Sequence, residues 1–279
     1  MGLSHRGVGS CNLAAVERGA GNGCEEMAAD PLLSARLRPC VAVIPAYNEA
    51  PAITAVVTLA LAQRLDGWPV FDQIIVVDND SSDNTTERAR AAGAHVVHQP
   101  ERGYGAACLK GIETAAAARC LVFIDGDASV DRSETARLPA PLVASAADLV
   151  IGARHNPLPG AVGLPQRFGN RLASALTRLL WRVSVADLGP FRAVRGEALA
   201  QLAMRDRRFG WTVEMQLRAI QTGLRPVEAP VQLLPRVGRS KISGTVRGVI
   251  GAARGIFGTI IALRWAEHQR ARQYPTRSR

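Results

Sequence analysis

One short stretch near the middle of this 279-residue chain constrains its fold more than any other. Residues 121–124 are Leu-Val-Phe-Ile, and Asp125, Gly126 and Asp127 follow them directly. Such an apolar run predicts a buried strand, and because strands alternate faces, Asp125 and Asp127 point to the same side. Two neighbouring carboxylates repel each other unless a cation lies between them. The stretch therefore predicts a site for Mg²⁺ or Mn²⁺, which also bind substrate phosphates; a surface Asp-Gly-Asp turn is the alternative.

The composition is that of a globular chain, since 47% of the residues are hydrophobic, enough for one large domain with a tail. The five cysteines are odd in number and lack paired spacing, so they predict neither a disulfide framework nor a zinc site. No N-terminal apolar segment resembles a signal peptide, and no run of about 18 uncharged apolar residues occurs. We expect a cytoplasmic protein that can also bind peripherally to the inner face of the cell membrane.

Positive charge is concentrated toward the C-terminal end. Residues 236–279 contain ten Lys or Arg and one acid, Glu267, whereas residues 1–235 contain 24 basic and 23 acidic residues. A basic segment of this kind can bind nucleic acid, anionic lipid or phosphorylated substrates. Nucleic acid is the weakest of these partners, because only 5% of the residues are aromatic and no stacking platform or recognition motif is present. We therefore expect no nucleic-acid partner.

The pattern of apolar residues divides the chain into three parts. Residues 1–38 lack sustained periodicity and predict a poorly ordered extension, in which Met27 is an alternative start to Met1. Residues 39–241 predict an α/β domain with a mostly parallel central sheet covered by helices, and residues 242–279 a basic amphipathic helix and tail. Strands are expected at residues 41–44, 73–77, 94–98, 121–124 and 148–152, and helices at residues 50–64, 84–92, 105–118, 133–146, 166–183, 213–221 and 242–272.

Polar residues follow the predicted strands at the edge where parallel sheets bind ligands. The first strand leads into residues 45–49, Pro-Ala-Tyr-Asn-Glu, and the second into Asp78, which is placed to accept a hydrogen bond from a base N–H. Residues 102–111 form a glycine-containing helix start, where small residues would let backbone amides approach a phosphate; close packing is the alternative. Together these strand ends predict a site for a nucleoside diphosphate.

Taken in order, these motifs resemble the family 2 glycosyltransferases with the GT-A fold. The resemblance is carried by residues 45–49, 78–85, 103–111 and 125–127, with further matches at residues 152–154, 187–192, 211–216 and 236–241. It is greatest to the branch that contains dolichyl- and polyprenyl-phosphate hexose synthases. The resemblance implies a metal-dependent inverting hexosyltransferase that moves a sugar from a UDP- or GDP-sugar to a polyprenyl phosphate at an anionic membrane surface.

The resemblance also implies roles for individual residues at matching positions. The nucleotide sugar would be bound by Pro45, Ala46, Tyr47, Glu49, Asp78, Gly105, Lys110, Asp125 and Gly126. Asp125 and Asp127 would bind Mg²⁺ or Mn²⁺, and the catalytic residues would be Asp127, Glu214 and Arg154. The acceptor and its phosphate would be bound by Arg192, Arg236, Ser240 and Lys241.

Departures from the family pattern leave the acceptor open. Residues 187–192 carry Gly-Pro where the family usually has Ser-Gly, and Tyr104 stands where lysine is common. A lipid phosphate is already anionic and needs no strong base, whereas a hydroxyl acceptor would require Glu214 to take its proton. A nucleotidyltransferase and a catalytically silent scaffold are weaker alternatives. For the C-terminal helix, packing on the sheet domain and binding to an anionic membrane are equally open.

Overall fold

The computed structural model describes residues 37–65, 67–131, 135, 138–144, 146–155, 164–183, 187–232, 234–238 and 246–273. Most of the extension predicted for residues 1–38 lies outside this description. Its last two residues belong to the folded domain, because Leu37 is buried in the core and Arg38 pairs with Asp72. The folded domain therefore includes Leu37 and Arg38, ahead of the predicted boundary.

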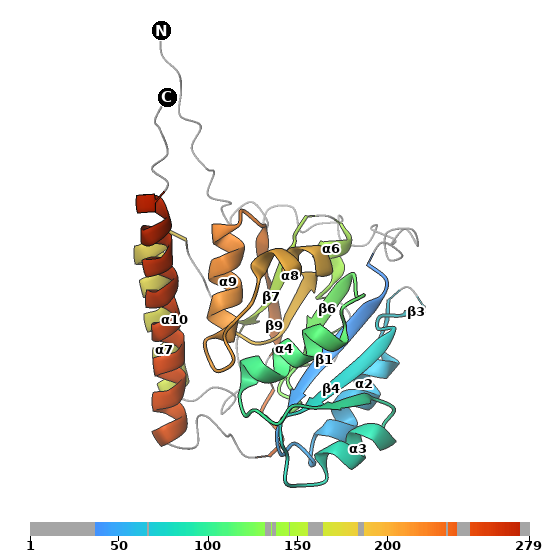
Figure 1. Cartoon of the computed structure of the whole chain (residues 1–279). Coiled ribbons are helices and arrows are strands. Elements are labelled where there is room, and N and C mark those ends of the chain that lie inside the picture. Colours follow the sequence, from blue (N-terminus) through green and yellow to red (C-terminus); the bar gives the residue numbers. More distant parts are fainter. Residues whose placement is uncertain are drawn as a thin grey trace.

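The centre of the molecule is a seven-stranded sheet with the order β5-β4-β1-β6-β8-β7-β9 (Figure 1). The strand β8 runs antiparallel to both of its neighbours, and the other pairings are parallel. The strands are β1 (Cys40–Ala46), β4 (Gln73–Asp78), β5 (His95–His98), β6 (Cys120–Phe123), β7 (Leu149–His155), β8 (Arg192–Arg195) and β9 (Pro226–Gln232). A separate ladder joins β2 (Arg64–Leu65) to β3 (Trp68–Pro69). The predicted α/β class with a mostly parallel sheet is confirmed.

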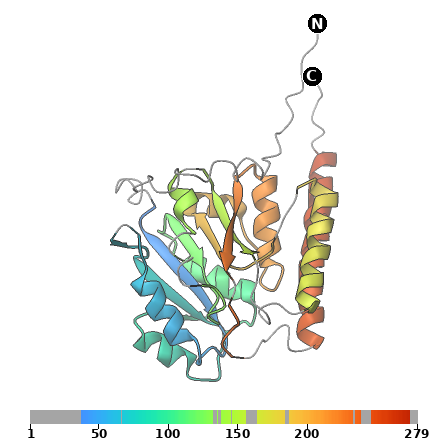
Figure 2. The ribbon, with the colours of Figure 1, turned by 180° about the vertical axis from the view of Figure 1, so that it is seen from behind.

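The strand β1 shows why the sheet has apolar residues at consecutive positions. Ala42 and Ile44 pack into one apolar cluster, whereas Val41 and Val43 pack into another on the opposite face. Helices cover both faces (Figures 1 and 2). The first cluster includes residues of α2 (Ile53–Ala62), α3 (Thr85–Ala91) and α6 (Ala140–Val143), and the second includes residues of α4 (Tyr104–Thr114), α8 (Gly196–Leu202) and α9 (Trp211–Gln221). Because both faces are buried, the strand has no polar face.

Two long helices lie side by side at one side of the molecule, next to α9 (Figures 1 and 2). They are α7 (Leu164–Trp181) and α10 (Val246–Gln273). A third apolar cluster includes Ala173 of α7, Val213 and Leu217 of α9, and Ile260 of α10. One face of the C-terminal helix therefore packs on the domain. Within the residues that the structure describes, no helix has the length and apolar character required to cross a membrane.

Some elements differ from the prediction for identifiable reasons. The strand β8 is four residues long with arginine at both ends, and β9 contains two prolines, so neither has the pattern of a buried strand. The described part of the helix predicted at residues 133–146 is interrupted: Thr135 is helical, and the short α6 begins only at Ala140. Pro139 and Pro141 lie at the start of α6, where proline is tolerated because its missing N–H would be unpaired there in any case.

Candidate active site

The two aspartates of the 125–127 motif lie at the carboxyl edge of the sheet. Ile124 N donates to Val43 O at 3.0 Å, which extends the pairing of β6 with β1 by one residue. Glu49 comes from the neighbouring strand end, and a Cβ on Gly126 would lie only 3.4 Å from Glu49 Cγ and from Pro45 O. The turn between the aspartates thus lies in van der Waals contact with the segment that follows β1.

Asp127 is buried, and both of its carboxylate oxygens have protein partners. Oδ1 accepts a hydrogen bond from the backbone amide of Ser129 at 3.0 Å, and Oδ2 lies 2.9 Å from Nη2 of Arg236. The same Nη2 lies 3.6 Å from Oε1 of Glu49. Arg236 therefore bridges two carboxylates that follow β1 and β6.

Arg236 is placed there by the segment that follows β9. The backbone amide of Leu234 donates to Ser129 O at 2.8 Å, and that of Val237 donates to Asp127 O at 2.9 Å. The two segments therefore run side by side, although they are far apart in the sequence. Arg236 was predicted to bind a phosphate, and the structure brings it to the predicted metal ligands.

Asp125 differs from Asp127 in its electrostatic environment. Burial, and after it the charge of Asp127, raise the pKa of Asp125 to about 7, against the opposing effects of Arg236 and the Tyr104 hydroxyl. Without an added cation, the protonated form of this carboxyl group is therefore favoured much more than in an ordinary aspartate. A cation at the site would favour its charged form.

The two aspartates fit a small divalent cation whose other ligands come from a substrate. Their environment favours positive charge, because Asp127 raises the pKa of Asp125 and Arg236 already lies against Asp127. The described residues contain no group of three or more His, Cys, Asp or Glu side chains that could hold an ion by themselves. Mg²⁺ usually keeps several waters and binds substrate phosphates, so two carboxylates are sufficient when a diphosphate is present.

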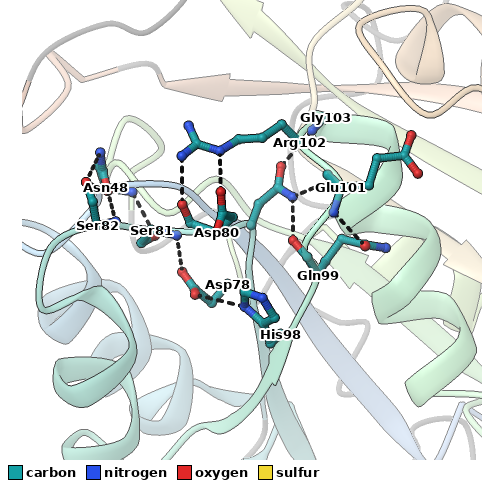
Figure 3. Close-up of polar contacts among 11 residues, drawn as sticks. Asn48, Asp78, Asp80, Ser81, Ser82, His98, Gln99, Glu101, Arg102 and Gly103 are labelled. Atoms are coloured by element: carbon teal, nitrogen blue, oxygen red, sulfur yellow. Dashed lines mark hydrogen bonds and ion pairs between the residues drawn. The ribbon is translucent and has the colours of Figure 1, made fainter.

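A second group of polar side chains lies beyond the ends of β1, β4 and β5 (Figure 3). Asp78 is buried there; its Oδ1 accepts from Ser81 N at 3.3 Å, and its Oδ2 lies 3.5 Å from His98 Nδ1. Asn48 links the ends of β1 and β4, since its backbone amide donates to Ser81 Oγ at 2.9 Å and its side-chain oxygen accepts from Ser82 N at 2.8 Å. The predicted nucleoside-binding residue Asp78 therefore lies in an ordered polar edge.

Tyr47 is covered by Arg102, which the sequence indicated only as added positive charge at the start of residues 102–111. The guanidinium carbon of Arg102 lies 3.9 Å from the centre of the Tyr47 ring, and its Nε lies 3.0 Å from Asp80 Oδ2. Pro45 and Ala46 form the buried end of β1 just before this tyrosine. Asp80 and Arg102 follow shortly after β4 and β5, at the ligand-binding edge of the sheet. This position is the sequence signal that could have identified both as site residues.

The glycine-containing start of α4 is a packing contact. Gly105 N donates to Arg208 O at 3.1 Å, and Ala106 N donates to Arg207 O at 2.8 Å. A Cβ on Gly105 would lie 2.1 Å from Asp206 O, so only glycine fits against this loop. The amides of Gly105 and Ala106 are therefore paired within the protein, and the nucleotide-binding role of Gly105 stays a prediction.

Two further predicted contacts are not supported by the structure. Lys110 lies on α4, where its Nζ bonds Oε2 of Glu113 on the same helix at 3.0 Å. Arg192 is fully buried and donates to Gly189 O at 2.9 Å and to Thr212 O at 2.6 Å, and burial lowers its pKa to about 10. Arg192 therefore joins the 187–192 segment to α9, and its guanidinium is not available to an acceptor phosphate.

Glu214 is buried in the first turn of α9, with its carboxylate occupied by other groups. It accepts from the backbone amides of Arg205 and Asp206 at 3.0 and 2.7 Å, and from Nε of Arg218 at 2.7 Å. These contacts hold the loop that packs against the start of α4. Glu214 therefore positions this loop in the structure, and its catalytic role, as the base if the acceptor is a hydroxyl, stays a prediction.

The remaining predicted residues lie at the limits of the described chain. Arg154 belongs to β7, where its main chain is in register with Val231 of β9, and its side chain falls outside the description. Ser240 and Lys241 also fall outside the described residues. The roles of these three residues stay predictions.

Comparisons with known proteins agree with this geometry. The sequence profile of glycosyl transferase family 2 matches residues 41–202. An uncharacterized glycosyltransferase of Mycobacterium tuberculosis (strain H37Rv) is 38% identical over 211 residues, which cover 75% of this chain and 91% of that protein. The undecaprenyl-phosphate mannosyltransferase of Micrococcus luteus is 30% identical over 225 residues, which cover 76% of this chain and 89% of that protein.

The fold is also that of a solved structure. Glucosyl-3-phosphoglycerate synthase of Mycobacterium tuberculosis, in complex with Mn²⁺, UDP and phosphoglyceric acid, is similar with a TM-score of 0.68. The match covers 83% of this chain and 81% of that chain at 23% sequence identity. The predicted GT-A fold is therefore confirmed.

Proposed function

This chain belongs to glycosyl transferase family 2, and we propose that it transfers a hexose from a UDP- or GDP-sugar to a polyprenyl phosphate. Membership of the family establishes that the chain is a glycosyltransferase that uses a nucleotide sugar. We propose three further points: that the sugar is a hexose, that the acceptor is a polyprenyl phosphate, and that the anomeric centre is inverted. An oxygen of the acceptor phosphate would form a bond to the anomeric carbon as the bond from that carbon to the diphosphate breaks. The nucleoside diphosphate would leave with the electron pair, and a single displacement of this kind inverts the anomeric centre.

The hydrogen bonding of Glu214 is the observation that carries the choice of acceptor. A general base must be free to reach the proton that it takes from a hydroxyl group. Both oxygens of Glu214 are instead occupied by Arg218 and by the amides of Arg205 and Asp206. A phosphate acceptor is already anionic and needs no such base. The similarity to an undecaprenyl-phosphate mannosyltransferase supports the same class of acceptor.

The proposed site has three parts. Asp78 and Tyr47, at the edge shown in Figure 3, would bind the nucleoside. Asp125 and Asp127 would hold Mg²⁺ or Mn²⁺, which when bound would neutralise the charge that develops on the leaving diphosphate. Arg236, which already lies at Asp127, would contact phosphate oxygens through charge-assisted hydrogen bonds. Arg154, Ser240 and Lys241 are assigned to the same phosphates by their match to the family pattern.

The outer surface of α7 and α10 supports peripheral binding to an anionic membrane. Large apolar side chains are exposed on both helices: Leu172, Leu179, Ile250, Ile261 and Trp265, with exposed fractions of 40%, 76%, 46%, 66% and 65%. Exposed arginines accompany them at Arg171, Arg178, Arg254 and Arg264. Glu267, the one acid in the sequence of α10, bonds Trp181 and Arg264. Apolar and basic side chains together are typical of helices that bind anionic lipid surfaces.

The proposal is tested by the release of nucleoside diphosphate from a panel of UDP- and GDP-sugars in the presence of Mg²⁺ or Mn²⁺. Each donor is assayed with and without undecaprenyl phosphate, and labelled sugar is followed into the organic phase. Release that requires the lipid phosphate, with sugar in the organic phase, would support the proposal. Turnover on hydroxyl acceptors and none on the lipid phosphate would overturn it. The variant Asp127→Asn, in which a predicted metal ligand is replaced, is the negative control and should release no nucleoside diphosphate above background.

A further inference from the structure

Both carboxylate oxygens of the predicted metal ligand Asp127 already have a partner within the protein. Its Oδ1 is held by the amide of Ser129 at 3.0 Å, and its Oδ2 lies 2.9 Å from Arg236 Nη2. The side chain of Asp127 is 11% exposed, and that of Glu49, the other partner of Arg236, is 9% exposed. The side chain of Arg236 is 32% exposed, so the pair is sheltered on its carboxylate side and is screened less by water and salt than a fully exposed pair. A divalent cation that approaches Oδ2 must therefore compete with the positive charge of the guanidinium that already lies there.

The position of Arg236 is defined by the backbone. The amides on both sides of it, from Leu234 and Val237, are bonded to the carbonyl groups of Ser129 and Asp127. Its guanidinium is only partly satisfied, however, because Nε is buried and has no hydrogen-bond partner among the described residues. Arg236 thus has a donor that an additional acceptor in the site, such as a phosphate oxygen, could use.

We propose that Arg236 is the resident counter-cation of the metal site, so that a divalent cation binds at Asp127 only together with the donor diphosphate. Metal alone would have to separate Arg236 from Asp127 without giving the guanidinium a new partner. A diphosphate supplies that partner and, at the same time, further oxygen ligands for the metal. This inference rests on the proposed function, because it takes the diphosphate to be that of the donor.

Binding of Mn²⁺ to the full chain tests the inference without any measurement of activity. Free Mn²⁺ is measured by electron paramagnetic resonance during titrations with and without UDP or GDP. The wild type should bind Mn²⁺ weakly alone and much more tightly with the nucleotide. Arg236→Gln should bind Mn²⁺ alone roughly tenfold more tightly than the wild type, because a competing positive charge close to the ligand is gone. Arg236→Lys, which keeps the charge, should stay near the wild-type value.

A matched control is available at the other end of β9. Arg225, which pairs with Asp148 at 3.0 Å, can be changed to glutamine with the same loss of charge away from the aspartates. Arg225→Gln should leave the affinity for Mn²⁺ alone unchanged. An affinity of Arg236→Gln equal to that of the wild type would overturn the inference, and so would an equal gain in Arg225→Gln.

A second measurement uses the wild-type protein and does not depend on the folding of a variant. The Nε–H resonance of Arg236 is followed by nuclear magnetic resonance as Mg²⁺ is added alone and then with the nucleotide. The inference requires little change with Mg²⁺ alone and a clear shift with both; saturation by Mg²⁺ alone would overturn it. Failure of UDP and GDP to bind at all would instead refute the proposed donor, which separates the two results.

Discussion

Asp125 and Asp127 are two residues apart, yet they differ in their electrostatic environment. Asp127 lies against Arg236 and its charge is compensated in the unliganded protein. Asp125 is partly buried next to that charge, and its pKa is raised to about 7. The pair therefore combines one carboxylate that already has a cationic partner with one whose charged form a bound cation would stabilise.

The raised pKa of Asp125 predicts a pH-dependent stability. The folded, metal-free protein holds a proton on Asp125 up to about pH 7, whereas the unfolded chain releases it near pH 4, so stability falls as the pH rises between these values. Asp125→Asn should therefore be more stable than the wild type at pH 8, by ~1–3 kcal/mol, with the difference vanishing near pH 4. Urea unfolding at several pH values without divalent cations measures this.

Asp148→Asn is the control with the opposite sign. Arg225 lowers the pKa of Asp148, so this carboxylate contributes stability above pH 4 that is lost in acid. Asp148→Asn should be less stable than the wild type at pH 8. A gain in Asp125→Asn that does not grow with pH would contradict the prediction.

Glu214 provides a second prediction for a single residue. Glu214→Gln should lower thermal stability, because the amide supplies one acceptor oxygen where the carboxylate serves Arg218 and two backbone amides. The kcat of the folded variant should fall by less than about tenfold, whereas loss of a general base costs 10²–10⁴-fold. Its pH profile should also match that of the wild type. Glu113→Gln, at an exposed position on α4, is the neutral control.

At the scale of elements, the start of α4 is connected to α9 through the loop at residues 203–210. The loop at residues 203–210 supplies carbonyl groups to the first amides of α4 and is itself held by Glu214 on α9. The same turn carries Tyr104, whose hydroxyl lowers the pKa of Asp125. The packing of α4 against this loop is thus linked to the environment of the metal ligands.

Gly105→Ala tests this connection. The new methyl group would lie 2.1 Å from Asp206 O, so the loop must move, and we expect a loss of ~1–3 kcal/mol of stability. Gly258 on α10 is the matched control, because a Cβ there meets nothing within 4 Å. Gly258→Ala should be neutral or stabilising, since alanine favours helix. Chemical denaturation of both variants provides the measurement, and equal effects would contradict the packing role.

At the scale of the whole molecule, α10 answers a question that the sequence left open. Its inner face packs on α9 and α7 through Ile260 and neighbouring apolar residues. Its other side exposes Ile261 and Trp265, one helical turn apart, while Ile250 lies three turns earlier. Packing on the domain and contact with a membrane are therefore compatible, because they use different faces of one helix.

Replacement of the exposed residues tests membrane contact. The double variant Ile261→Ser with Trp265→Ser should bind anionic vesicles about tenfold less tightly, because it removes two large apolar side chains from the outer surface. Trp68→Ser is the control, since Trp68 is 61% exposed on β3. Sedimentation with vesicles of anionic and neutral lipid measures the effect. Equal binding of the double variant and the wild type would exclude this surface.

The sequence by itself determined the α/β class, the strands β1, β4 and β6, and the place of Asp78, Asp125 and Asp127 at their ends. These features are local: each strand is a run of apolar residues buried on both faces, and a carboxylate directly after it falls at the sheet edge. The order of the motifs was likewise sufficient to indicate the family and its GT-A fold.

Only the tertiary structure decided what those side chains meet. The contacts of Arg236 with Asp127 and Glu49 depend on the pairing of β9 with β7 and on the hydrogen bonds of the backbone amides that follow β9. No local sequence pattern specifies this pairing. The same holds for Gly105 and Glu214, whose partners belong to a loop without periodicity. Apolar periodicity specifies which residues are buried, whereas hydrogen-bond partners far apart in the sequence are set by the way the elements pack.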